Sequence, residues 1–253
     1  MRQHVKFDRP PVVEVVCGVR FNTGGRIKLA HLGAFWATLK DAYPVAEEAA
    51  PIMRAPIDNE PDLVPRTWLI TADGSELLQL QKDWFLLNWK KADDSHPYPS
   101  YSLVKSAFDK RFGEFSDFLA SEGIDINYRK LELTYVNHIS NANGLGEVEQ
   151  GELFVDHLYS SNDRFLPTPV QINWKTSYVL PKGYGRLNVT AQTGMIKSTG
   201  ERLIRLDLQA LGLPGKASRD QMEDWFEVAH EWITRGFVDI TAPKLHELWG
   251  RTL

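Results

Sequence analysis

Apolar side chains alternate with polar ones along several segments of the chain, which is the pattern of a β-strand with one buried face. In residues 12–21 every second side chain, from Val13 to Phe21, is apolar. The same alternation predicts further strands at 68–72, 76–81, 84–91, 128–139, 170–180, 185–193 and 201–212. Asp73-Gly74 lies between two of these strands and is a strong signal for a tight hairpin. A turn at Gly194 or at 198–200 is expected to join the last two strands.

Other segments carry apolar residues at three- and four-residue spacing, which predicts amphipathic helices. The first stripe consists of Leu29, Leu32, Trp36, Leu39 and Tyr43. Similar stripes predict helices at about 102–121, 152–159 and 219–235. We expect Thr241 to cap a short final helix that ends near Trp249.

Residues 41–65 have a different composition from the segments around them. They contain five prolines and six acidic residues but only one basic residue, Arg54. This composition predicts a long surface connection. We further expect residues 45–64 to form a mobile acidic segment that becomes ordered when a partner binds, because few of its side chains suit a core.

The order of these elements predicts an α+β fold. Strands that follow one another as hairpins form antiparallel sheets, and the amphipathic helices are expected to pack on one face of them. The chain reads either as two related halves, with the order βαβββαβ in residues 1–140 and αβββα in 141–253, or as one continuous domain. A short echo between 87–91 and 172–176 favours duplication no more than chance does.

Composition narrows the possible classes of protein. Of the 253 residues, 43% are hydrophobic and 25% are charged, which is typical of a globular domain. The net charge of −4 argues against a dedicated nucleic-acid binder. We find no apolar leader and no stretch of about 20 apolar residues, so we expect a cytoplasmic protein without a membrane partner. The single cysteine, Cys17, excludes an intramolecular disulfide and is expected in the core.

Motifs that would indicate catalysis are incomplete. His230-Glu231 begins a zinc-protease pattern, but Thr234 stands where the second histidine belongs. Gly215-Lys216 lacks the other residues of a phosphate-binding loop. The seven histidines are scattered, and His138 near a strand end is read as structural rather than catalytic. We therefore expect no catalytic residue, no metal and no cofactor.

Charged side chains on the predicted polar strand faces are the main candidates for binding. Arg20, Lys130, Arg186 and Arg205 lie on four different strands, with Glu14, Glu132 and Asp207 interleaved among them. These faces either converge on a groove that holds an anion, or they form the solvated side of an antiparallel sheet. In the second case the charges serve as cross-strand pairs.

Two tryptophans followed by lysine extend this set. A tryptophan next to a lysine either stacks on a base or sugar, or is a half-buried sheet residue whose lysine neighbour reaches the solvent. The complete set of candidate binding residues is Arg20, Trp89, Lys90, Lys130, Trp174, Lys175, Arg186 and Arg205.

Both ends of the chain carry patches that resemble a known family. Residues 7–16 (FDRPPVVEVV) with 18–21, and residues 229–233 (AHEWI) with Phe237 and 245–251 (LHELWGR), resemble sporadically distributed bacterial proteins of about 250 residues. That family has no settled function, so no catalytic residues carry over from it. Its patchy occurrence implies horizontally mobile cargo, such as phage-defence or toxin–antitoxin genes.

Two hypotheses of function follow from the sequence. The first is a non-catalytic interaction or regulatory module that acts with a protein partner. The alternative is an anion- or nucleotide-binding protein, or an enzyme, that uses the polar groove between strand faces. The sequence leaves the oligomeric state open.

Overall fold

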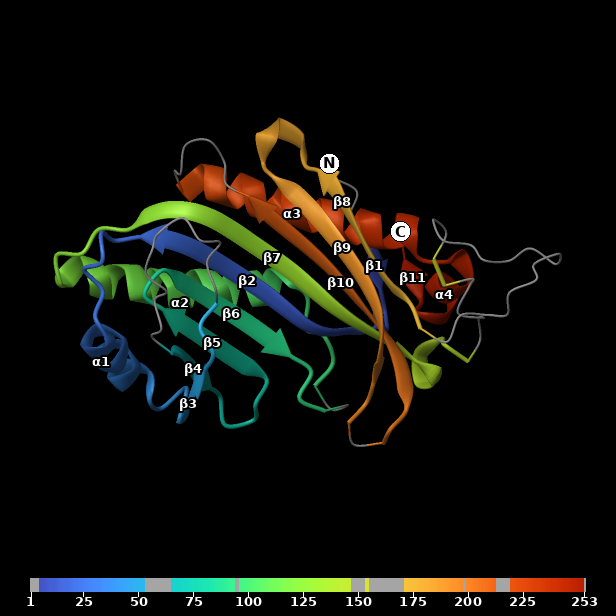
Figure 1. The fold of residues 1–253 in the computed structure, drawn as a ribbon, viewed down its shortest axis with the longest axis horizontal. Helices are drawn as coiled ribbons and strands as arrows, with labels where there is room; N and C mark the ends of the chain where they lie inside the picture. The colour runs from blue at the N-terminus through green and yellow to red at the C-terminus, as the bar shows by residue number, and fades with distance from the viewer. Residues whose placement is uncertain are drawn as a thin grey trace. The chain divides into compact units, whose positions relative to one another are not determined.

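A computed structural model describes residues 5–52, 65–93, 96–146, 153–154, 171–197, 199–212 and 219–252. It confirms the α+β fold (Figure 1): in the described residues, the strands form one antiparallel sheet of nine and a second sheet of two. The chain divides into two compact units. We call residues 15–132 the central unit, and residues 1–14 with 133–253 the terminal unit. The proposed relationship between the halves 1–140 and 141–253 stays a prediction.

The central unit contains two helices, the first part of β7 (Asn127–Ser140) and five further strands in the order β3-β4-β5-β6-β2. The strands are β2 (Val12–Asn22, which begins in the terminal unit), β3 (Val45–Ala49), β4 (Arg66–Ile70), β5 (Glu76–Gln81) and β6 (Trp84–Lys90). The helices are α1 (Leu29–Leu39) and α2 (Tyr101–Ser121). Helix α2 packs against β6, and phenylalanine rings fill the space between helices and sheet. The predicted hairpin is confirmed, since Ile70 pairs with Leu77 on either side of Asp73-Gly74.

The segment 41–65, predicted as a surface connection, contains a strand, β3, although four of the five strand residues are exposed as expected. Residues 45–49 pair with β4, from Val45 opposite Ile70 to Ala49 opposite Arg66. Beyond the strand, Ile52 packs on Val16, Trp84 and Leu86. The sequence of β3, VAEEA, shows no apolar alternation from which a strand could be predicted. It forms a strand because β4 offers a free edge with which it can pair. The remainder of the predicted mobile segment, 53–64, lies outside the described residues.

The terminal unit contains the second half of β7 and three further strands, in the order β7-β10-β9-β8. The strands are β7 (Asn127–Ser140), β8 (Asn173–Val179), β9 (Arg186–Met195) and β10 (Arg202–Gly212). Helix α3 (Arg219–Ile240) packs against β9 and β10, as Figure 1 shows. Short 3-10 turns follow β7 at Asn141–Asn143 and β8 at Pro181–Gly183. The β9–β10 turn reaches Gly200, whose amide donates to Ile196, whereas Gly194 lies inside β9.

Three expectations for the terminal unit are corrected. Helix α3 runs to Ile240 rather than to 235, because Gly236 and the residues after it keep helical hydrogen bonding. In the predicted helix 152–159, the described residues Leu153 and Phe154 instead form a bend and a β-bridge to Thr241. The other residues of that helix lie outside the described part of the chain.

Thr241 does not cap the final helix, α4 (Pro243–Leu248). Ala242 occupies the position before the helix and Pro243 begins it, as proline favours. Thr241 Oγ1 instead bonds the carbonyl of Phe237 at the end of α3 and lies 2.8 Å from Nε2 of buried His246. The chain ends also pair: β1 (Lys6–Phe7) joins β11 (Arg251–Thr252), a sheet too short to predict from alternation.

Candidate interaction surface

The eight candidate residues are divided between the two units. The central unit contains Arg20, Trp89, Lys90 and Lys130, and the terminal unit contains Trp174, Lys175, Arg186 and Arg205.

Two of the candidate arginines are already paired with carboxylates. Arg20 Nε lies 3.2 Å from Oδ2 of Asp83, a buried aspartate that also accepts a 2.9 Å bond from Gln81. Arg205 Nε lies 2.9 Å from both carboxylate oxygens of Asp207, two residues along the same strand. These contacts support the reading of the polar faces as sheets with neutralised charges.

The two candidate tryptophans pack toward other aromatic rings. Trp89 is 8% exposed and meets Tyr98 edge to face, with ring centroids 5.3 Å apart. Trp174 is half-buried and contacts Phe154 in the same manner at 5.3 Å. Lys90 and Lys175 follow them in the strand, so they lie on the opposite face, and both are exposed. This packing supports the interpretation of both tryptophans as sheet residues, Trp89 buried and Trp174 half-buried, with solvated lysine neighbours.

Lys175 and Arg186 lie on one face of the β8–β9 pair. The register places Lys175 opposite Thr190, and Val179 opposite Arg186. Because paired residues and residues two apart share a face, Lys175, Val179 and Arg186 do so as well. Lys175 and Arg186 are exposed, and neither forms an ion pair within the described residues. Lys130 is half-exposed on β7 and is not brought to this pair by any described contact.

Strand β8 is the last strand of the sheet on its side, in the part of the chain that the structure describes. Its hydrogen bonds to β9 are fixed at both ends: Thr193 donates to the carbonyl of Ile172, and Leu180 donates to that of Gly185. In an antiparallel pair such bonded pairs alternate, so the even-numbered residues of β8 bond to β9. The backbone groups of the odd-numbered residues therefore point to the open edge: Asn173, Lys175, Ser177 and Val179.

Apolar side chains are exposed near this edge. Val179 at the end of β8 and Met195 at the end of β9 are each 69% exposed, and Tyr178 is 37% exposed. The sequence reasoning missed Ser177 and Val179, because their importance depends on which strand lies beside β8 and in which register. Alternation within one segment carries no information about either.

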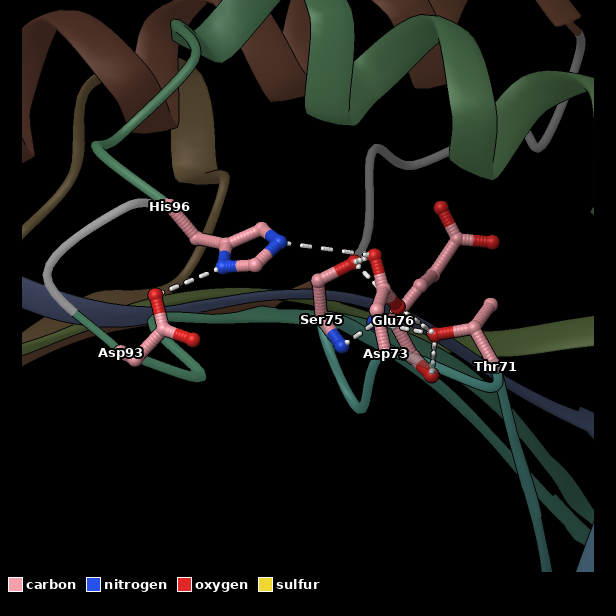
Figure 2. Close-up of polar contacts among 6 residues, drawn as sticks. All are labelled: Thr71, Asp73, Ser75, Glu76, Asp93 and His96. Atoms are coloured by element: carbon pink, nitrogen blue, oxygen red, sulfur yellow. Dashed lines mark hydrogen bonds and ion pairs between the residues drawn. The ribbon is translucent and has the colours of Figure 1, made fainter.

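The β4–β5 turn contains Asp73, an exposed acid that accepts several hydrogen bonds. Asp73 accepts hydrogen bonds from Thr71 Oγ1 at 2.7 Å and from the amide and hydroxyl of Ser75 at 3.0 and 2.9 Å (Figure 2). These bonds, the one from Thr71 foremost, lower the pKa of Asp73 to about 2. The cluster stabilises the turn, because a charged carboxylate satisfies the backbone where the chain reverses.

His96 lies between two carboxylates beside this turn. Its Nδ1 is 2.9 Å from Asp93 Oδ1, and its Nε2 is 3.7 Å from Asp73 Oδ2 (Figure 2). The hydrogen bond to Asp93 is the main cause that raises the pKa of His96. The Ser75 hydroxyl donates to Asp73 rather than to the imidazole of His96, so this serine and this histidine do not form a nucleophile–base pair.

We expect His96 to titrate above the ordinary histidine value of about 6.5. Since folding raises its pKa, the stabilisation from His96 is complete below pH ~6.5 and is lost as the pH rises through the folded-state value. Asp93→Asn should lower the His96 pKa in an NMR titration. Asp117→Asn, which removes the same charge from the exposed surface of α2, should leave it unchanged. Equal shifts in both variants would contradict the assignment to Asp93.

His138 has a different environment. Burial lowers its pKa, and Arg205 lowers it further, while Asp207 acts in the opposite direction. A half-buried imidazole next to an ion pair fits the structural role expected from the sequence. Within the described ranges, no group of three histidine, cysteine or acidic side chains is placed to hold a metal ion.

The described helices also include none that is long and apolar enough to cross a membrane. Cys17 is buried, as expected from its position in β2. No protein-family model and no curated protein sequence matches this chain.

Proposed function

We propose that this protein is a non-catalytic interaction module that binds a segment of a protein partner along the open edge of β8. The observation that carries the proposal is the row of outward-facing backbone groups at Asn173, Lys175, Ser177 and Val179. An extended peptide that joins a sheet edge gains main-chain hydrogen bonds, and side-chain contacts then select it. Exposed Val179 adds apolar area next to this edge.

The titratable groups support a binding role over a catalytic one. Asp73 accepts a hydrogen bond from Thr71 within the β4–β5 turn, and His96 beside the turn contacts Asp93. Arg20 and Arg205 each have a carboxylate partner. The alternative, an anion- or nucleotide-binding groove between strand faces, would need these arginines for its ligand. The proposal that the partner belongs to a mobile bacterial defence or toxin–antitoxin system rests on the family resemblance alone.

Site-specific photo-cross-linking in cells that carry the gene tests this proposal. A benzophenone amino acid at Val179 should capture one partner protein, whereas the same group at Leu103, 61% exposed on α2, should not capture it. Ser177→Pro should abolish the cross-link, because proline removes an outward N–H and leaves the backbone bonds to β9; the side-chain bond from Ser177 Oγ to Asn188 on β9 is lost equally in the alanine control. Ser177→Ala keeps that N–H and should retain the cross-link. Identical products from Val179 and Leu103, or an unaffected Ser177→Pro variant, would contradict the proposal.

A further inference from the structure

The charges next to the open edge indicate what kind of segment binds there. On the face that Lys175 shares with Arg186, strands β8, β9 and β10 carry three cations, Lys175, Arg186 and Arg205. The same face carries one carboxylate, Asp207, so its net charge is 3 − 1 = +2. Asp207 is occupied by Arg205, which leaves Lys175 and Arg186 as the cations without an ion pair in the described residues. On these three strands the face is positive, although the chain as a whole has a charge of −4.

The spacing of these cations matches an extended strand. Lys175 and Val179 are four residues apart, which is about 13 Å along a strand. Val179 lies between the open edge and its cross-strand neighbour Arg186, so an added strand would meet Lys175 directly and Arg186 across Val179. Side chains directly opposite each other on adjacent strands have Cβ atoms about 5 Å apart, so a carboxylate opposite Lys175 is within reach of an ion pair. Arg186 is two strands from the added strand, about 10 Å away, a distance that the long arginine and glutamate side chains can span.

The other face of β8 has a different character. Trp174, Thr176 and Tyr178 alternate with the residues that point to the cationic face. A segment that pairs with β8 therefore meets cations on one face and two aromatic rings with a threonine between them on the other.

We propose that the segment bound at β8 is an acidic strand, with carboxylates at alternate positions facing Lys175 and Arg186 and apolar residues between them. This inference rests on the proposed function and names the chemistry of the partner. The carboxylates would pair with the two cations, and the backbone would bond to the four outward-facing residues of β8. The ion pairs lie at an exposed rim, so each should contribute modestly to the binding affinity. This affinity should fall as the salt concentration is raised.

Synthetic peptides test the inference without knowledge of the natural partner. Fluorescein-labelled EVEVEVE, with blocked ends, should bind the full chain in an anisotropy titration, and KVKVKVK should bind at least tenfold more weakly. The double variant Lys175→Glu with Arg186→Glu should weaken the acidic peptide by about tenfold and strengthen the basic one.

The control is the double variant Lys40→Glu with Lys110→Glu, which makes the same change in net charge at exposed lysines of the central unit. It should leave the affinity for the acidic peptide within twofold of the unmodified protein. Circular dichroism of both double variants shows whether the fold is kept. An equal loss in both would assign binding to net charge and overturn the inference.

The outcomes separate this inference from the proposed function. In one outcome the two peptides bind equally well, or neither binds, while Ser177→Pro still abolishes a cross-link at Val179. This outcome overturns the acidic strand but leaves the interaction module. Absence of that cross-link overturns the interaction module itself. A dimer of the protein alone that Ser177→Pro dissociates in sedimentation would make a second copy of the chain the occupant, and would also overturn the acidic strand.

Discussion

Gly212→Ala is expected to destabilise the terminal unit by about 4 kcal/mol or more, an unusually large effect for one methyl group. A Cβ at this position would overlap the carbonyl of Tyr184 and lie 3.0 Å from the Cα of Gly185. The chain cannot move this carbonyl freely, because the indole of fully buried Trp225 donates to it at 2.8 Å. The added methyl group would therefore collide with the backbone of the neighbouring strand. Moving the two backbones apart to remove this collision would break the end of the β9–β10 pair.

Equilibrium unfolding in urea measures this effect, with Gly33→Ala as the matched control. Gly33 is exposed in α1, and a Cβ at this position would meet no neighbouring atom within 4 Å. Alanine there should stabilise the central unit by about 0.5–1 kcal/mol, because glycine is a poor helix residue. A Gly212→Ala protein with unchanged stability would show that the two strands do not approach each other as described.

Phe115→Ala is expected to cost about 3–5 kcal/mol of the stability of the central unit. Phe115 in α2 is fully buried, with its ring centroid 5.1 Å from that of Phe35, 5.2 Å from Phe85 and 6.0 Å from Phe21. It thus joins both helices to two strands, and its removal leaves a cavity that rigid neighbours cannot fill.

Phe118→Ala is the control for this prediction. Phe118 lies on the same helix and contacts Phe35 at 5.6 Å, but it is only half-buried. Its replacement should cost less than half as much in urea unfolding followed by tryptophan fluorescence. Similar costs for the two variants would indicate that helix propensity, rather than the buried ring cluster, explains the loss.

The amino-acid pattern determined the elements whose signal is local. The alternation in β2, the stripe of α2 and the Asp73-Gly74 turn each depend on residues close in sequence, and the structure has all three. From these the α+β class follows, because hairpins and amphipathic helices admit few arrangements. The pattern also identified Arg186 as a polar-face cation, since side-chain parity along a strand is local as well, whereas Lys175 was singled out as the lysine next to Trp174.

The tertiary structure alone decided which side chains meet. Arg20 pairs with Asp83, 63 residues away, and β3 exists because β4 offers it an edge. Likewise, the exposed backbone of Ser177 depends on β8 being the last strand of its sheet in the described residues. The physical reason is that pairing partners, registers and sheet edges are set by contacts between segments distant in sequence, whereas propensity and periodicity record only the preferences of neighbouring residues.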